Sequence, residues 1–203
     1  MNMTMDTTLL LLFIAAFFLG SIPFAYLAGR LKGLDIRQHG SGNIGATNAF
    51  RVLGSAMGAT VLLLDAGKGV VATLWAFSYA GETAAVIAGL AAIMGHTYSP
   101  FMRFKGGKGV ATAAGVVITL VPEVALICII LFAIVVAISK YVSLGSIVVA
   151  LALPILIFLF NKPLSYQIFA LATALFVIYR HVPNIKRLLA GQENSIRRNY
   201  PKF

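Results

Sequence analysis

A polar segment with four glycines and three strongly basic side chains interrupts an otherwise apolar part of the chain between residues 95 and 109. It ends in Lys105-Gly106-Gly107-Lys108-Gly109, directly before another apolar stretch. Backbone N–H groups at the start of a helix, together with a lysine, attract anions. Cations that snorkel to a membrane surface would explain Arg103 and Lys105 better than Lys108, which lies among glycines. The segment therefore predicts an anion site, most simply for a phosphate group.

A second polar segment, from Gly40 to Arg51, is also rich in glycine and in hydrogen-bond donors. Its glycines let backbone N–H groups crowd around an anion, and Arg51 offers a fork suited to phosphate oxygens. A tight loop with ordinary turn chemistry is the alternative. The side-chain donors in this segment are Ser41, Asn43, Thr47, Asn48 and Arg51.

Neither segment matches a nucleotide-binding loop. The first-mentioned segment has Met102 where a Walker-type loop needs glycine, and Gly109 where that loop needs serine or threonine. The second contains GxGxxG by letter, but a dinucleotide-binding fold needs a preceding strand and a βαβ unit, and apolar helical segments flank this one.

A third polar group follows the last apolar stretch, where Arg180, His181 and Asn184 lie close together in the chain. Alone, this group would be an ordinary basic tail at a membrane surface. We include it among the candidate anion-binding groups because we expect the other two polar segments on the same face of the membrane. Ser143 and Ser146 lie near the inner end of another apolar stretch, and face either the same site or a neighbouring helix.

The elements that must position these groups are membrane helices. Of the 203 residues, 60% are hydrophobic, whereas about 45–50% is usual for a soluble domain. Pro122-Glu123 breaks one apolar stretch into two predicted spans, 109–122 and 124–140. Both of these spans are short for a membrane helix, so the alternative is that they form one long helix. The apolar residues fall in long blocks that predict transmembrane helices over 7–30, 57–80, 83–98, 109–122, 124–140, 143–160 and 164–180.

Charge placement decides the orientation of these helices. The residues before the first block include Asp6 and no Lys or Arg, unlike a signal peptide, so we expect a retained first helix. With six spans the basic C-terminus would lie outside, against the positive-inside rule. With seven spans and the N-terminus outside, fourteen of the 16 basic residues face the cytoplasm, namely Arg30, Lys32, Arg37, Arg51, Arg103, Lys105, Lys108, Lys140, Arg180, Lys186, Arg187, Arg197, Arg198 and Lys202.

These arguments predict an all-α integral membrane protein, a single polytopic domain over 1–203 with seven transmembrane helices and a cytoplasmic C-terminus. Lys162 falls outside together with Asp6, Glu82 and Glu123. The net charge of +10 needs no nucleic-acid partner, because the orientation accounts for most of it. We expect all of the polar motifs to lie on the cytoplasmic face.

Two ionisable residues, Asp65 and Lys68, fall inside the second span. Residues three apart share a helix face, and charges in a membrane are costly unless paired or functional, so we predict that they pair and brace the helix. The Gly20-Ser21-Ile22-Pro23 sequence predicts close helix approach and a kink. Cys128 lies in a span and predicts packing. No spacing of His, Asp and Glu predicts a metal site.

Taken together, the motifs resemble those of the bacterial acyl-phosphate-dependent glycerol-3-phosphate acyltransferases. The length, the seven spans and the order of the motifs agree from end to end. The His-x₄-Asp signature of the other glycerol-3-phosphate acyltransferase family is absent. The motifs that carry the resemblance are Ser41-Gly42-Asn43-Ile44-Gly45-Ala46-Thr47-Asn48, Gly95-His96, Phe104-Lys105-Gly106-Gly107-Lys108-Gly109-Val110-Ala111-Thr112, and Tyr179-Arg180-His181 with Asn184-Ile185.

The resemblance implies transfer of a fatty acyl group from acyl phosphate to the 1-hydroxyl of glycerol 3-phosphate, giving lysophosphatidate and phosphate, without a cofactor. It further implies a location in the bacterial plasma (inner) membrane, membrane lipids as surroundings and a functional link to the enzyme that makes acyl phosphate. The implied catalytic residues are Ser41, Arg51, Lys108, His181 and Asn184. The implied substrate-binding residues are Asn43, Thr47, Gly106, Gly107 and Ser143.

The chemistry of the residues fits this implication. Two phosphate-bearing substrates need several donor loops on one face, and an acyl phosphate is already activated, so positioning and charge neutralisation suffice. The proton of the attacking hydroxyl goes either to a substrate phosphate oxygen, whose second pKa is about 6, or to His181. His96 is another candidate base, whereas we expect His39 to face solvent.

Two other classes of protein compete with this reading. A transporter or channel for a phosphorylated metabolite would also use cations and helix termini. However, its site usually lies near the membrane midplane, and the polar motifs here gather at one end. A lipid-binding scaffold would explain the basic tail but not the glycine-rich loops.

Overall fold

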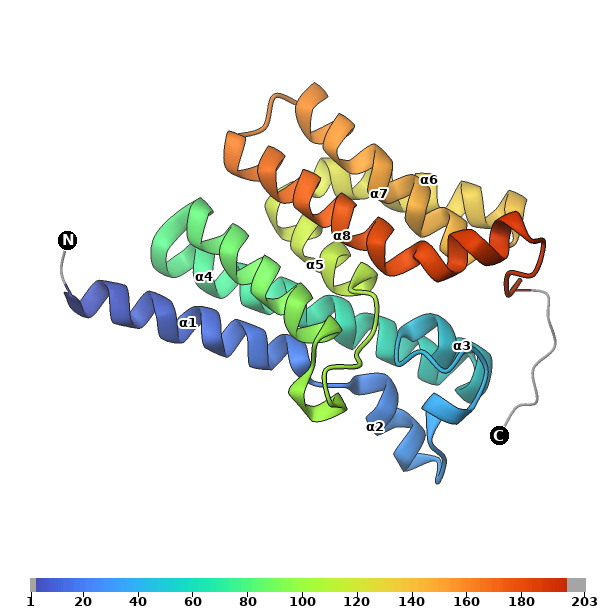
Figure 1. Ribbon diagram of the computed structural model, residues 1–203. Helices are drawn as coiled ribbons and strands as arrows, with labels where there is room; N and C mark the ends of the chain where they lie inside the picture. The colour runs from blue at the N-terminus through green and yellow to red at the C-terminus, as the bar shows by residue number, and fades with distance from the viewer. Residues whose placement is uncertain (1–2, 197–203) are drawn as a thin grey trace. The chain divides into compact units, whose positions relative to one another are not determined.

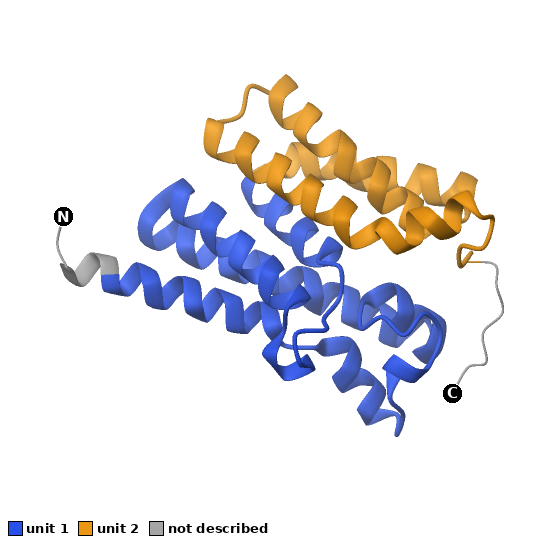
Figure 2. Cartoon of the chain, viewed as in Figure 1, with its two compact units in different colours: residues 1–120, 202–203 blue, residues 121–201 orange. Residues whose placement is uncertain are grey.

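The computed structural model describes residues 3–196, with side chains from residue 7 onward, and within that range the chain forms helices and loops without a strand (Figure 1). Arg197, Arg198 and Lys202, expected on the cytoplasmic face, lie outside the described residues, as does the side chain of Asp6. The chain divides into two compact units, and the boundary between them falls between residues 120 and 121 of the sequence (Figure 2). The single domain expected over 1–203 stays a prediction.

The first unit contains most of the helices. Its elements are α1 (Met3–Ser21), α2 (Phe24–Leu31), the 3₁₀ turn η1 (Ile36–Gln38), α3 (Ala46–Leu53), α4 (Ser55–Thr97), the 3₁₀ turn η2 (Pro100–Met102) and α5 (Val110–Leu120). The predicted kink after Gly20 is confirmed, because α1 ends at Ser21 and Pro23 starts a new helix without donating a backbone hydrogen bond.

The long helix α4 is broken where the sequence predicts two spans. Ala80 leaves the helical conformation, and Gly81 adopts φ +74°, a left-handed value that favours glycine. The predicted break between 57–80 and 83–98 is therefore confirmed. In Figure 1 the chain reverses at this point, so that the two halves of α4 lie side by side.

Small residues let α1 and α5 approach α4 closely. A Cβ atom added to Gly20 of α1 would lie 2.1 Å from the backbone oxygen of Ala92, and one added to Gly115 of α5 would lie 2.0 Å from that of Ala66. Such distances are far below van der Waals contact, so only glycine fits. Close backbone approach is how helices gain packing energy in a membrane, where lipid removes the hydrophobic drive between them.

The described part of the second unit contains three helices, α6 (Pro122–Ser139), α7 (Val142–Leu159) and α8 (Leu164–Leu189), which pack in sequence order (Figure 1). The predicted break at Pro122 is confirmed, because Val121 leaves the helical conformation and proline occupies the first position of α6. At one end of this unit, Lys162 and Glu123 form an ion pair. The last helix extends nine residues beyond the predicted span 164–180, through Pro183 to Leu189.

Within residues 3–196, five segments are long and apolar enough to cross a membrane, judged by length and composition. α5 has only 11 residues, or about 16 Å of helix, which is short of the hydrocarbon thickness of about 30 Å. The helical fold and the membrane-spanning character expected from the sequence are thus found. The five segments are Thr7–Leu31, Ser55–Met102, Pro122–Ser139, Val142–Leu159 and Leu164–Leu189.

Candidate functional site

The first donor-rich loop, residues 39–45 with the helix α3 that follows, is organised by the side chain of Asn48. Asn48 is 1% exposed. Its Oδ1 accepts a hydrogen bond from the N–H of Ser41 at 2.8 Å, and its Nδ2 donates to the carbonyls of His39 at 3.0 Å and Ile36 at 3.2 Å. The sequence suggested Asn48 as a donor for an anion, and the structure corrects that reading, since its amide is used to shape the loop.

The glycines of this loop serve the same packing. Gly40 has φ +63°, and a Cβ atom there would lie 2.3 Å from Oδ1 of Asn48; Gly42 has φ +70°. Both positions need a left-handed backbone, which explains the chance match to GxGxxG without a nucleotide.

The predicted ligands of the first loop remain accessible to different degrees. Ser41 is exposed, whereas Asn43, Thr47 and Arg51 are half-buried. Thr47 and Arg51 are four residues apart on α3 and therefore share one helix face. The structure thus keeps a hydroxyl and a guanidinium of the predicted set together on α3.

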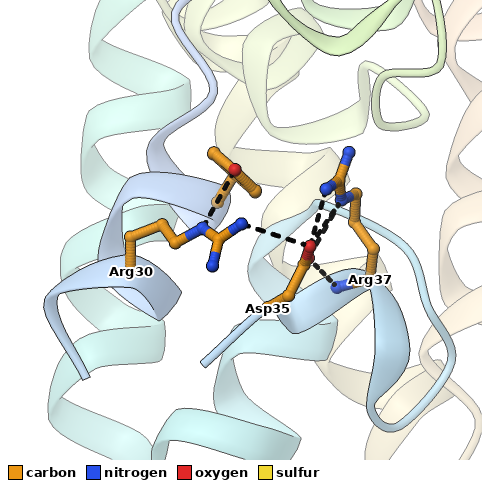
Figure 3. A network of polar contacts seen from close by, with 4 residues as sticks. Arg30, Asp35 and Arg37 are labelled. Atoms are coloured by element: carbon orange, nitrogen blue, oxygen red, sulfur yellow. Dashed lines mark hydrogen bonds and ion pairs between the residues drawn. The ribbon is translucent and has the colours of Figure 1, made fainter. Parts of the chain in front are cut away.

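The entry to this loop is held by Asp35, which lies between two arginines (Figure 3). Asp35 caps η1 by accepting from the N–H of Arg37 at 3.1 Å, and its Oδ2 accepts from the Arg37 guanidinium at 2.6 Å. Arg30 is 3.6 Å from the same oxygen, and its Nε donates to the Tyr26 hydroxyl at 2.9 Å. The hydrogen bonds and charge of Arg37, with a smaller contribution from Arg30, lower the pKa of Asp35 to about 2. These two arginines are therefore engaged in shaping the loop.

The second donor-rich loop, residues 103–109, folds back on the end of α4. The N–H groups of Gly106 and Gly107 donate to the carbonyls of Thr97 at 2.9 Å and His96 at 3.1 Å. A Cβ atom on Gly106 would lie 2.1 Å from the His96 oxygen. The idea that these two N–H groups bind an anion is therefore corrected, because they close the loop.

Lys108 lies half-buried immediately before α5. Gly109, with φ +80°, turns the chain into the helix, and its carbonyl accepts the backbone hydrogen bond of Ala113 at 2.8 Å. The N–H groups of residues 110 to 112 precede that hydrogen bond, so they point out of the start of the helix, beside the lysine. An anion placed here would meet a cation and the positive end of a helix dipole.

The two loops lie at the same end of the first unit. Met102, the last residue of η2 and directly before the second loop, belongs to the same buried apolar cluster as Ile44 and Ala46 of the first. The two polar segments therefore adjoin one apolar cluster within this unit, and the cytoplasmic face expected for them stays a prediction.

In the second unit, Ser143 and Asn184 meet at a residue to which the sequence reading assigned no role, Glu193. The Oε1 atom of Glu193 accepts from the Ser143 hydroxyl at 3.1 Å and from Nδ2 of Asn184 at 2.7 Å, while Oε2 accepts from Nε of Arg187 at 2.8 Å. Burial alone would raise the pKa of Glu193, but the hydrogen bonds from Asn184, Arg187 and Ser143 and the charge of Arg187 lower it. A lone acid among basic residues of the tail was the signal that could have found it.

His181 is buried, with 2% exposure. Its Nδ1 lies 2.8 Å from the carbonyl oxygen of Val177. A carbonyl oxygen only accepts, so Nδ1 carries the proton, and in the neutral ring the lone pair is on Nε2. His181 and Asn184 are three residues apart on α8 and share a face of that helix. The imidazole can therefore present Nε2 as an acceptor or, when charged, as a donor.

The ion pair predicted between Asp65 and Lys68 is confirmed, with Lys68 Nζ 2.9 Å from Asp65 Oδ1. His96 joins them, with Nδ1 3.5 Å from the same oxygen. Among the described residues, no group of three or more His, Cys, Asp and Glu side chains is arranged to hold a metal ion. Cys128 is buried and free, as expected for a packing residue.

Comparison with known proteins gives a consistent result. Residues 10–191 match the family model described as glycerol-3-phosphate acyltransferase. Glycerol-3-phosphate acyltransferase 2 of Moorella thermoacetica is 47% identical over 188 residues, which cover 92% of this chain and 97% of that protein. The glycerol-3-phosphate acyltransferase of Carboxydothermus hydrogenoformans is 46% identical over 182 residues, covering 89% and 93%.

Two crystal structures of PlsY (YgiH), an integral membrane glycerol 3-phosphate acyltransferase, are also similar. The glycerol 3-phosphate form has a TM-score of 0.90 at 41% identity, covering 93% of this chain and 96% of that one. The lysophosphatidic acid form has a TM-score of 0.88 at 40% identity, covering 93% and 95%.

Proposed function

Because this chain belongs to the glycerol-3-phosphate acyltransferase family, and so acylates glycerol 3-phosphate in phospholipid synthesis as an integral membrane protein, we propose that its acyl donor is acyl phosphate. The acyl group passes to the 1-hydroxyl, and the products are lysophosphatidate and inorganic phosphate. The observation that carries this proposal is the pair of donor-rich loops at one end of the first unit, which suits substrates that both bear phosphate.

The reaction needs no enzyme nucleophile. The hydroxyl oxygen attacks the acyl carbon, the bond from that carbon to the phosphate oxygen breaks, and phosphate leaves with the electron pair. The hydroxyl proton goes to a substrate phosphate oxygen or to Nε2 of His181, which is the lone-pair nitrogen of the neutral ring. Rate enhancement then comes from holding the two substrates in line and from neutralising charge on the leaving group.

The residues divide into two roles. We assign charge neutralisation to Arg51, Lys108 and His181, and orientation of phosphate oxygens to Ser41 and Asn184. A supporting observation is that Thr47 and Arg51 share a face of α3. We assign substrate contacts to Asn43, Thr47 and Ser143, while Gly106 and Gly107 act by letting the loop that carries Lys108 pass close to α4.

For the membrane topology we propose seven crossings with the N-terminus outside, in the bacterial plasma (inner) membrane, and an active site on the cytoplasmic face. The break at Gly81 supports two crossings within α4. The pairing of Glu123 with Lys162 supports the expectation that both lie on the outer side. We propose that acyl phosphate, the acyl donor, reaches the site from the membrane. We also propose a functional link to the enzyme that makes acyl phosphate.

Phosphate release by the purified protein in detergent tests the proposal. Palmitoyl phosphate is supplied with and without glycerol 3-phosphate, and lipid products are identified by mass. Release that depends on glycerol 3-phosphate, with lysophosphatidate formed one for one, is the expected result, and Lys108→Ala should abolish most of it. Absence of release in a folded sample, with lipid added back, would rule out acyl phosphate as the donor; acylation with acyl-CoA in the same sample would then identify the alternative.

A further inference from the structure

The polar residues in the middle of the first unit form one connected group that begins at the kink in the first span. The break at Pro23 leaves carbonyl groups at the end of α1 without helical partners, which is costly in an apolar surrounding. Lys68 Nζ donates to the Ile22 carbonyl at 3.0 Å, and the Ser99 hydroxyl donates to the Ser21 carbonyl at 2.6 Å. A residue inside the first half of α4 and a residue just after its last turn thus each contribute a donor to the kink.

Asp65 connects Lys68 to the end of α4. One carboxylate oxygen, Oδ1, lies 2.9 Å from Lys68 Nζ and 3.5 Å from Nδ1 of His96. The exposed fractions of Asp65, Lys68 and His96 are 1%, 3% and 7%. Side chains so deeply buried have few alternative positions, and the imidazole ring lies beside the Asp65 carboxylate on its Nδ1 side.

The other side of the same ring lies against the second loop. A Cβ atom added to Gly107 would be 2.1 Å from Nε2 of His96 and 3.0 Å from its Cδ2 and Cε1 atoms. The backbone of His96 also accepts the N–H of Gly107 at 3.1 Å. Gly107, the residue directly before Lys108, therefore contacts both the imidazole ring and the backbone carbonyl of His96. Since the backbone of Gly107 covers Nε2, this histidine is poorly placed to serve as a base.

We propose that Asp65 and His96 are positioning residues for the acyltransferase reaction. Asp65 fixes the imidazole, and the Nε2 edge of the imidazole sets how closely Gly107 approaches α4, which in turn places Lys108 for a substrate phosphate. The inference rests on the proposed role of Lys108. It explains why a buried carboxylate inside a membrane span serves chemistry that takes place in a loop more than 40 residues later in the chain.

This arrangement is tested with two variants, one that removes side-chain volume at His96 and one that adds volume at Gly107, and with the double variant that combines them. His96→Asn keeps an N–H donor near Asp65 but removes the Nε2 side of the imidazole ring. Gly107→Ala adds a methyl group at the place that this side of the ring occupies. Each single variant should raise KM for glycerol 3-phosphate and lower kcat/KM by about 10- to 100-fold, because a shift of about 1 Å in a phosphate ligand has effects of that size. The double variant should recover at least about tenfold over Gly107→Ala, since the methyl group then has room. Asp65→Asn should resemble His96→Asn.

The controls separate positioning from folding and from the proposed function. Thr73→Val, another buried position on α4, should retain wild-type KM. A merely structural role would reduce the amount of active enzyme and leave KM unchanged, so an unchanged KM in both single variants overturns the inference, as does a double variant whose losses multiply. Lys108→Ala is measured alongside. If it keeps the wild-type KM while His96→Asn does not, the proposed role of Lys108 fails instead.

Discussion

The side-chain amide of Asn184 lies 2.7 Å from Oε1 of Glu193 and donates a hydrogen bond to it. This contact fixes which way the amide points, because the carboxylate only accepts and the amide nitrogen must therefore face it. The same oxygen accepts from Ser143, and the other from Arg187. A residue of the C-terminal tail therefore orients two of the proposed substrate ligands.

Replacing Glu193 should affect both stability and activity. Glu193→Ala leaves three donors without their acceptor, and we expect a loss of about 2 kcal/mol in the free energy of unfolding together with a reduced kcat/KM. Glu193→Gln keeps the shape but loses the charge, so we expect an intermediate loss in both quantities. Thermal unfolding in detergent and steady-state kinetics measure them. Wild-type values for Glu193→Ala would show that the hydrogen bonds do not matter.

The loop around Ser41 offers a matched pair of variants. Asn48→Ala removes three hydrogen bonds from a buried side chain, and should cost about 2 kcal/mol of stability as well as activity. Ser41→Ala leaves those hydrogen bonds intact, since Asn48 binds the backbone N–H of Ser41. We therefore expect Ser41→Ala to lower kcat/KM with an unchanged unfolding midpoint. A lower midpoint for Ser41→Ala would contradict this division of roles.

The stability of the first loop should depend on acid because of Asp35. Its pKa of about 2 in the folded protein lies below the ordinary value of 3.8, so its contribution is fully present above about pH 4 and is lost as the pH falls toward 2. Asp35→Asn should lack this contribution at any pH. The difference in unfolding midpoint between wild type and Asp35→Asn should therefore shrink between pH 5 and pH 2. A difference that is constant over this range would contradict the lowered pKa.

The role of His181 can be read from the pH dependence of the rate. If Nε2 takes the hydroxyl proton, His181→Gln should lose most activity and the acidic limb of the pH–rate profile should disappear, because that limb reports protonation of the base. Substantial activity with an unshifted profile would assign the proton to a substrate phosphate. Kinetics at saturating acyl phosphate, from pH 5 to pH 9, distinguish the two outcomes.

The breaks in the helices could be predicted from the sequence because they depend on local residues. Proline at positions 23 and 122 and glycine at position 81 coincide with these breaks, whereas α8 continues through Pro183. The pairing of Asp65 with Lys68 was predictable for the same reason, as residues three apart on a helix always share a face.

The contacts that could not be predicted join residues far apart in the chain. Glu193 binds Ser143, 50 residues away, and no local pattern specifies that contact. The glycines at 106 and 107 were predicted to bind substrate, but their N–H groups bind the carbonyls of Thr97 and His96. The sequence shows which positions are glycine. Only the packing of the loop against α4 shows which acceptors the N–H groups of those glycines bind.

The pair formed by Asp65 and Lys68 also has a consequence for biogenesis. A lone Asp or Lys near the centre of a span adds about 2.5–3.5 kcal/mol to the free energy of insertion by the translocon, whereas two opposite charges one turn apart can neutralise each other as the segment enters the lipid. Replacing either residue alone should therefore lower the yield of inserted protein. Replacing both, as in Asp65→Asn with Lys68→Met, should restore the yield and leave the catalytic defect. The same two side chains thus influence how many molecules reach the membrane and how well each one works.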